Sequence, residues 1–318
     1  MAEFGYFLAS EEHGPRRLLE VGVLAEAAGF DRVWISDHYH PWTDAQGQSP
    51  FVWAVIGGLA ARTGLRVTTA VTCPTMRIHP AVVAQAAATC SLLLQGRFQL
   101  GVGSGEALNE RILGARWPRV AERQAMLAEA VEVMRRLWTG ELVSHDGRHY
   151  RVENARIYSY PDTPPPVIVS GFGPDAVELA ARIGDGWCAT MPDAELVARY
   201  QAAGGKGPKQ AGMKVCWGQD EAAARRLARE LWPNEALAGQ LAQELALPAY
   251  FEQATELVTE DMVAATVPCG PDPERHAAAI REYVEAGYDE VYVQQIGPDQ
   301  EGFFDFWKRE LAPRLGAG

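Results

Sequence analysis

The stretch RVWISDHYHPW, residues 32–42, is the part of this sequence that decides the fold class. Arg32–Ile35 is a short run suited to a buried strand, and Ser36–Trp42 then places two histidines, a carboxylate and a tryptophan directly after it. In parallel α/β folds the functional side chains follow the carboxyl ends of buried strands. The stretch therefore indicates a parallel sheet, with a candidate site at this strand end.

The same pattern recurs along the chain, because short apolar runs alternate with longer amphipathic stretches. The eight runs are Phe4–Leu8, Arg32–Ile35, Leu65–Val71, Phe98–Val102, Pro166–Val169, Gly186–Ala189, Met213–Trp217 and Glu290–Gln294. The amphipathic stretches include Arg16–Ala28, Ala81–Leu94, Ala121–Trp138 and Asp175–Ile183. Eight strand–helix units predict an α/β fold, a (β/α)8 TIM barrel, with a doubly wound sheet as the alternative.

Residues 140–166 interrupt this alternation. The segment GELVSHDGRHYRVENARIYSYPDTPPP holds an Asp-Gly pair between two alternating runs and ends in prolines. This pattern predicts a β-hairpin insertion before the fifth strand, followed by a proline-rich tether. We expect a single barrel domain over residues 1–318 that carries the insertion at about 140–166.

Composition narrows the class of protein. The chain has 318 residues, 47% hydrophobic and 22% charged, and a net charge of -12, which argues against nucleic acid as a partner. No apolar run approaches the ~18 residues of a membrane span. Five scattered cysteines and an N-terminus without a basic region predict a cytoplasmic protein with reduced thiols. We expect its partner to be a small-molecule substrate, with no nucleic acid and no membrane involved.

Titratable residues gather at the ends of the predicted strands. They are Glu11 after the first strand, Asp37, His38 and Trp42 after the second, and Glu106 and Asn109 after the fourth. At a barrel mouth these ends would bring carboxylates beside an imidazole, which is the arrangement that acid–base catalysis needs. A structural role for His38, bonded to a backbone carbonyl, and core packing for Trp42 stay open. His40 is interpreted as part of the turn.

Two glycine turns are candidate phosphate sites. Ser104-Gly105 follows the fourth strand and Gly171-Phe172-Gly173 follows the fifth, each before a helical pattern. Exposed amides at a helix start suit a phosphate, although glycine can simply close a tight turn there. The spacing in Gly101–Gly105 is not that of the dinucleotide fingerprint. The ends of the sixth and seventh strands carry the least chemistry.

A metal site is weighed and set aside. The pair His38-x-His40, with Glu11 or Glu106, offers ligand types that zinc accepts. The sequence has no HExxH and no second histidine cluster, so we predict no metal.

Three stretches carry a resemblance to a known family. SDHYHPW, GVGSGEALNE and TCPTMRIHPAVVAQAAAT resemble the luciferase-like superfamily and, within it, the group of F420-dependent glucose-6-phosphate dehydrogenases. The similarity extends over almost the whole chain. It implies a (β/α)8 barrel that binds coenzyme F420 across its mouth and forms a homodimer.

The resemblance also implies roles for individual residues. His38 corresponds to the general base, Glu106 to a carboxyl beside the deazaflavin, and Trp42 and Glu11 to residues of the substrate pocket. Ala70-Val71 corresponds to a non-prolyl cis peptide bond. The implied cofactor contacts are Asp37, Ala70, Val71, Ser104, Gly105, Asn109, Gly171, Phe172 and Gly173.

The sequence departs from this group where a sugar phosphate would be held. Met191-Pro192-Asp193 and Val263–Thr266 stand where the group has lysines, and such residues do not bind a phosphate dianion. We therefore predict an F420-dependent oxidoreductase that transfers a hydride between F420 and an alcohol or hemiacetal other than glucose 6-phosphate. The alternatives are a monooxygenase that uses reduced FMN and a barrel that binds a ligand without catalysis.

Overall fold

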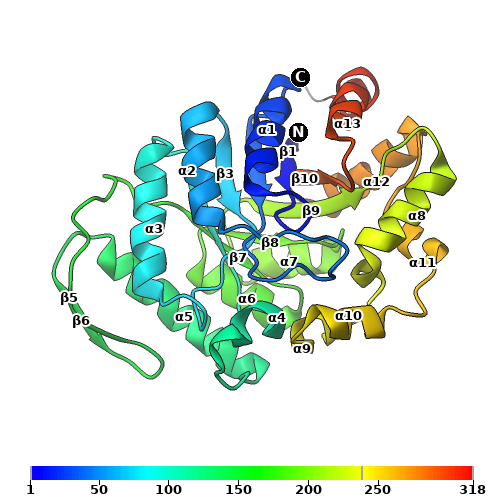
Figure 1. Ribbon diagram of the computed structural model, residues 1–318. Coiled ribbons are helices and arrows are strands. Elements are labelled where there is room, and N and C mark those ends of the chain that lie inside the picture. The colour runs from blue at the N-terminus through cyan, green and yellow to red at the C-terminus, as the bar shows by residue number, and fades with distance from the viewer. Residues whose placement is uncertain (1, 238, 317–318) are drawn as a thin grey trace.

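A computed structural model describes residues 2–237 and 239–316. Eight parallel strands close into a barrel in the order β1-β10-β9-β8-β7-β4-β3-β2 (Figure 1). The barrel strands are β1 (Glu3–Leu8), β2 (Arg32–Ile35), β3 (Arg66–Thr69), β4 (Phe98–Val102), β7 (Val167–Ser170), β8 (Gly186–Ala189), β9 (Lys209–Val215) and β10 (Glu290–Gln295). The predicted (β/α)8 barrel is confirmed, and the doubly wound alternative is wrong.

Helices surround the barrel. They are α1 (Pro15–Ala27), α2 (Val52–Arg62), α3 (Pro80–Leu93), α5 (Val120–Leu137), α6 (Pro174–Ile183), α7 (Ala194–Ala202), α8 (Glu221–Leu231), α12 (Pro273–Ala286) and α13 (Gln300–Phe306), with a π-helical turn (Trp307–Leu311) and α14 (Ala312–Leu315) at the C-terminal end. The four helices that the sequence predicts lie within one residue of their predicted bounds. No helix among residues 2–237 and 239–316 is long and apolar enough to cross a membrane.

The predicted hairpin is present as β5 (Val143–Asp146) and β6 (Arg151–Ala155), which pair antiparallel. It projects from one side of the barrel near α3 and α5 (Figure 1). The carboxylate of Glu129 on α5 accepts hydrogen bonds from the backbone amides of His149 and Tyr150. The Tyr150 hydroxyl donates to the carbonyl of Thr75, in the loop after β3 (3.1 Å). These bonds hold the insertion against the barrel.

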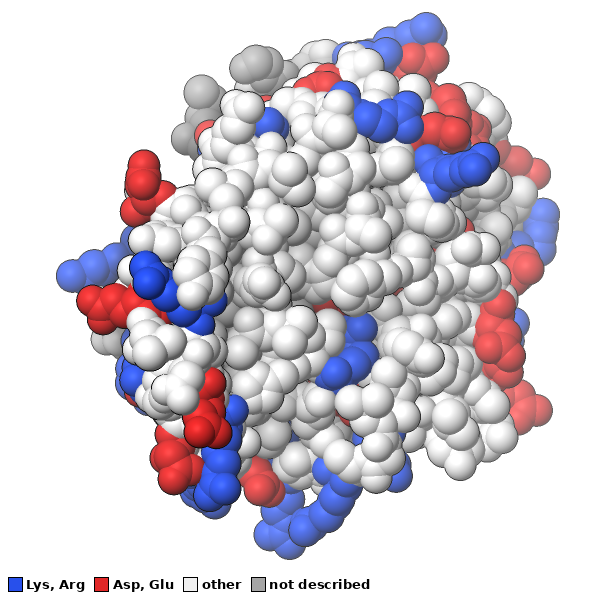
Figure 2. Space-filling view, turned by 60° about the vertical axis from the view of Figure 1, so that its left-hand side comes forward, with Lys and Arg blue, Asp and Glu red and all other residues white. Residues whose placement is uncertain are grey.

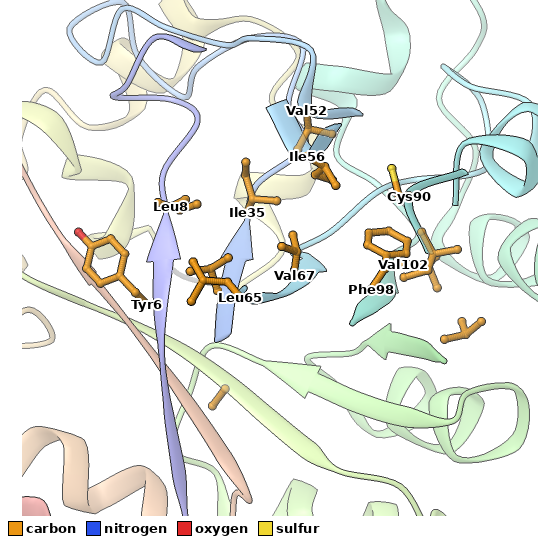
Figure 3. Packing of buried hydrophobic residues seen from close by; sticks show 14 of the residues in the cluster. Tyr6, Leu8, Ile35, Val52, Ile56, Leu65, Val67, Cys90, Phe98 and Val102 are labelled. Atoms are coloured by element: carbon orange, nitrogen blue, oxygen red, sulfur yellow. The ribbon is translucent and has the colours of Figure 1, made fainter. Parts of the chain in front are cut away.

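Alternation along the strands produces two separate cores. Ile35, Val67 and Val102 point outward and pack beneath α2 and α3 (Figure 3). Phe7, Trp34 and Tyr292 fill the inside of the barrel, with the Trp34 and Tyr292 rings stacked 4.6 Å apart. Because successive side chains of a strand face opposite sides, neighbouring residues such as Trp34 and Ile35 serve different cores. A filled interior leaves the mouth, at the carboxyl ends of the strands, as the place for a site.

The segment after β9 differs from the sequence analysis. The strand begins at Lys209, four residues before the predicted start. The apolar pattern missed this start because the polar Gln210 lies inside the barrel, where it bonds Gln99 and Glu290. After α8 come short helices that the apolar periodicity did not reveal. They are a 3-10 turn (Pro233–Ala236), α9 (Leu241–Glu244), α10 (Pro248–Ala254) and α11 (Glu260–Ala264). This segment brings Trp232 and Val263 into a second apolar cluster with Ala9 and Ile296, which follow β1 and β10.

Candidate active site

His38 and Glu11 form a buried pair at the mouth. Oε1 of Glu11, which follows β1, lies 3.6 Å from Nδ1 of His38, which follows β2. The other carboxylate oxygen accepts a hydrogen bond from the Ser36 hydroxyl (2.7 Å). His38 is 9% exposed and Glu11 is 2% exposed, so little solvent screens their interaction.

The hydrogen bonds of His38 fix which ring nitrogen carries the proton. Nδ1 lies 3.2 Å from the carbonyl oxygen of His40, and a carbonyl can only accept. In the neutral ring Nδ1 therefore donates, and Nε2 keeps its lone pair. Nε2 makes no hydrogen bond to any residue that the structure describes. A neutral imidazole in this state has a basic nitrogen free for a ligand.

His40 belongs to the turn, as predicted. Its Nδ1 lies 2.9 Å from the carbonyl oxygen of Leu108. The side-chain oxygen of Asn109 accepts from the backbone amides of Tyr39 and His40, at 2.8 and 3.1 Å. The Asn109 Nδ2 group is buried and has no partner among the described residues. These contacts join the loop after β2 to the short helix α4 (Ala107–Glu110) that follows β4.

Trp42 presents an aromatic surface at the mouth and is backed by the fully buried Phe251. Trp42 is half-buried, with its ring edge-on to His38 (centroids 4.9 Å apart) and to Phe251 of α10 (5.2 Å). The Trp42 amide donates to Gln46, whose side chain donates to the carbonyl of Leu231 at the end of α8. The segment after β9 therefore contacts and supports the loop after β2. Trp42 packs against this segment on one side, and part of its surface stays exposed.

Asp37 is held by two donors. The Thr72 hydroxyl donates to Oδ2 at 2.7 Å, and the Arg77 guanidinium donates to Oδ1 at 2.9 Å. The backbone amide of Arg77 also donates to Oε2 of Glu110 (2.8 Å). Burial outweighs the lowering effect of the Arg77 contacts, so the pKa of Glu110 is raised to about 7. The sequence analysis missed Arg77 and Glu110, although Glu110 is the last residue of GVGSGEALNE.

The turn after β4 presents Ser104, Gly105 and Glu106 toward the mouth end of the strand. Gly105 has φ +91°, and a Cβ there would lie 2.8 Å from the Glu110 side chain, so this turn requires glycine. Glu106 is the N-cap residue of α4, but its side chain makes no capping hydrogen bond. Ser104 and Glu106 are half-buried, and each keeps part of its surface open.

The peptide bond between Ala70 and Val71 is cis, which confirms that expectation. Both residues are half-buried and pack on the inner core cluster. Gly171, Phe172 and Gly173 form the turn between β7 and α6, and β7 is the barrel neighbour of β4. Phe172 is 51% exposed, and Gly173 is the N-cap residue of α6 and offers no side-chain cap. This turn therefore contributes backbone groups and one exposed ring to the rim.

The end of β9 contributes a charged side chain, Lys214, to the mouth, although the sequence predicts little of functional interest there. Lys214 shares the inward-facing side of β9 with Gln210 and Gly212, and its ammonium lies 2.9 Å from Glu235 and 4.3 Å from the centre of the Trp232 ring. Alternate placement of Gln210, Gly212 and Lys214 on one face is the signal that would have located it. By contrast, Lys209 bonds Asp289, the residue just before β10.

Glu12 is a second buried carboxylate that the sequence analysis passed over. It accepts hydrogen bonds from the Trp232 indole (2.5 Å), the Gln294 amide (3.1 Å) and the backbone amide of Gly297 (2.7 Å). Burial outweighs the lowering effect of these three donors, so the pKa of Glu12 is raised to about 7. Glu12 therefore ties the end of β1 to the end of β10 and to the aromatic segment after β9.

Comparisons with known proteins agree with this geometry. The family model described as luciferase-like monooxygenase matches residues 2–290. The chain is 36% identical to an F420-dependent glucose-6-phosphate dehydrogenase of Nocardia farcinica, covering 99% of this chain and 98% of that protein. A relative with the same name from Rhodococcus jostii is 37% identical, over 98% of each. Among solved structures, an F420-dependent secondary alcohol dehydrogenase in complex with an F420-acetone adduct matches with a TM-score of 0.92 and 30% identity, over 99% of both chains.

Proposed function

The chain belongs to the luciferase-like monooxygenase family, among its F420-dependent dehydrogenases, and from this premise we propose that it oxidises an unphosphorylated alcohol or hemiacetal. The observation that carries the proposal is the His38–Glu11 pair, in which Nδ1 is occupied and Nε2 is free. The same site can run in the reducing direction, since the transfer of a hydride and a proton is reversible.

The residues at the mouth fit coenzyme F420. Asn109 keeps a buried amide group without a partner, which suits an acceptor atom of a ligand. Asp37, Val71, Ser104 and Gly105 would hold the ring, and the Gly171–Gly173 turn would offer backbone amides to a phosphate. Pro174, the first residue of α6, lacks an N–H, so the donors there would come from the turn itself.

When bound, coenzyme F420 supplies a deazaflavin carbon that accepts a hydride. His38 Nε2 removes the hydroxyl proton of the substrate as the hydride leaves the carbon that bears that hydroxyl. Glu11, 3.6 Å away, stabilises the imidazolium that forms. Trp42 orients the substrate by packing on its apolar face. Glu106, half-buried and free of a capping bond, would be the carboxyl available to the cofactor on this side of the mouth.

The residues at the two positions where the related dehydrogenases are expected to have lysines favour a substrate without a phosphate. Asp193 caps α7 by accepting from the amides of Glu195 and Leu196, and Val263 is buried in the second apolar cluster. Neither position offers a cation. Lys214 is already paired with Glu235. The half-buried ring of Trp42, packed on the fully buried Phe251, suits a small alcohol with an apolar part, as in the secondary alcohol dehydrogenase to which the chain is similar.

We also propose that the protein is a homodimer, with α2 and α3 at the interface. Figure 2 shows a broad, largely uncharged face on the side of the molecule where these helices lie. Phe51, which precedes α2, is 60% exposed, and Val82, Leu92 and Leu93 of α3 are exposed by 55, 44 and 52%. Burial of such a surface between two copies would be favourable. Light scattering should report a dimer that Leu93→Glu dissociates, and a monomeric wild type would contradict this assignment.

The function is tested by following F420 reduction with paired substrates. Propan-2-ol, other secondary alcohols and glucose are compared with glucose 6-phosphate under the same conditions. We expect turnover with at least one unphosphorylated alcohol or sugar and a lower kcat/KM with glucose 6-phosphate. A higher kcat/KM for glucose 6-phosphate would overturn the substrate assignment. Activity with reduced FMN and oxygen, and none with F420, would instead identify a monooxygenase.

A further inference from the structure

Arg77 lies buried among three strand ends, in the loop after β3. Its side chain is 7% exposed. One guanidinium nitrogen donates both to the side chain of Asp37 (2.9 Å) and to the Asp37 backbone carbonyl (3.3 Å). On the other side, the Arg77 amide donates to Glu110 (2.8 Å), and Nε faces the second Glu110 oxygen at 3.6 Å. The Arg77 side chain therefore bonds the segment after β2 and, through Nε, lies in ion-pair contact with the segment after β4, where the backbone amide makes the hydrogen bond.

The two residues that Arg77 contacts, Asp37 and Glu110, are directly linked to His38 and Glu106, which act in the proposed mechanism. The Asp37 carbonyl belongs to the peptide unit that joins Asp37 to His38, so a bond to it restricts the backbone that carries the imidazole. Glu110 ends the single turn of α4, and its amide donates to the carbonyl of Glu106 (3.1 Å). Holding Glu110 therefore holds the turn that presents Glu106.

Resting on the proposed function, we propose that Arg77 is a positioning residue that sets His38 and Glu106 relative to one another and to the cofactor. It touches neither the substrate nor the reacting atoms. Its guanidinium donates to Asp37 through one nitrogen and faces Glu110 at 3.6 Å through Nε, and a lysine ammonium on a flexible stem cannot reproduce this planar arrangement. Misplacement of reacting groups by about 1 Å lowers turnover by about 100-fold, so this geometry bears on the rate.

Arg32 provides a matched control. It is also a buried arginine, 3% exposed, and it pairs with Glu3, Asp31 and Glu290. These partners lie at the amino-terminal end of the barrel strands, opposite the mouth. Replacing either arginine disturbs a buried ion pair, but only Arg77 contacts the segments that carry His38 and Glu106.

The experiment compares Arg77→Lys and Arg77→Gln with Arg32→Lys and Arg32→Gln. The fraction of each protein that binds F420 is first counted by stoichiometric fluorescence titration. We then measure the Kd for F420, the kcat per bound F420 and the KM for the alcohol. For Arg77→Lys we expect kcat per bound F420 to fall about 10- to 100-fold and the Kd to rise, with the KM for the alcohol within about threefold. Arg32→Lys should lower the melting temperature but leave kcat per bound F420 unchanged.

The outcomes separate this proposal from the function on which it rests. If the wild type fails to bind F420, the function itself is wrong. If the wild type turns over and Arg77→Lys keeps the wild-type Kd and kcat per bound F420, losing only melting temperature as Arg32→Lys does, then Arg77 is a structural residue and the positioning role is refuted. If Arg77→Gln does not fold, Arg77→Lys, which keeps the charge, decides the question.

Discussion

Replacing Glu11 by glutamine removes one charge from the proposed acid–base pair and leaves its shape unchanged. Glutamine can still accept the hydrogen bond from the Ser36 hydroxyl, so the loop geometry should persist. What is lost is the attraction between a carboxylate and the imidazolium of His38, whose Nδ1 lies 3.6 Å from Glu11. The imidazolium forms as His38 accepts the proton of the substrate, so the loss raises the barrier to reaction.

The magnitude follows from this distance. Two unit charges 3.6 Å apart attract by about 4–5 kcal/mol at an effective dielectric constant of about 20. The amide dipole of glutamine retains part of this attraction, and the transition state carries less than a full charge. We take about 2 kcal/mol as the loss, which lowers kcat by about 30-fold.

The assay is steady-state reduction of saturating F420 by the best alcohol substrate, with F420 affinity measured separately by fluorescence titration. Glu178→Gln is the matched control, because Glu178 is a surface carboxylate on α6 that pairs with Arg199 on α7. It should leave kcat unchanged. A Glu11→Gln enzyme with kcat within about threefold of the wild type would refute the reasoning, since a pair at this distance in a buried site must then contribute little.

Three further predictions follow from the same site. His38→Ala should lower kcat by about 100- to 10,000-fold with little change in the Kd for F420, and equal losses in both would contradict the role of base. Because burial raises the pKa of Glu12 from 4.5 to about 7, the folded state binds its proton more tightly than the unfolded state. The unfolding free energy of the wild type relative to Glu12→Gln should therefore fall by about 3 kcal/mol as pH rises from about 4.5 to 7, and urea unfolding that shows a pH-independent difference would count against this shift. Gly105→Ala should destabilise the protein by about 1–3 kcal/mol, because φ is +91° and the new Cβ would meet Glu110, whereas an unchanged melting temperature would mean that the turn relaxes.

The barrel could be predicted because its strands are apolar and its helices amphipathic. Strands such as Arg32–Ile35 and Phe98–Val102 are buried from both sides, so they read as short apolar runs between helical patterns. The start of β9 could not be predicted in this way, because the polar side chain of Gln210 faces the inside of the barrel, where it bonds Gln99 and Glu290. The small helices after α8 could not be predicted either, since each is too short to show a clear helical period of apolar residues.

The candidate site could be predicted where chemistry directly follows a strand. Glu11, His38 and Trp42 lie within seven residues of a strand end, and the structure brings them together. The role of Arg77 and the inward position of Lys214 could not be predicted, for different reasons. Arg77 lies eight residues beyond β3 and acts through partners that only the folded chain brings near. Lys214 lies within a strand, where a charged residue signals its inward position only once the strand's register is known.

The central claim, that this barrel uses coenzyme F420 to transfer a hydride, is tested most directly by fluorescence titration of the purified protein with F420 and, separately, with FMN. We expect saturable binding of F420 at one site per chain and much weaker binding of FMN. Tighter binding of FMN than of F420 would contradict the account, and His38 would then need a different role.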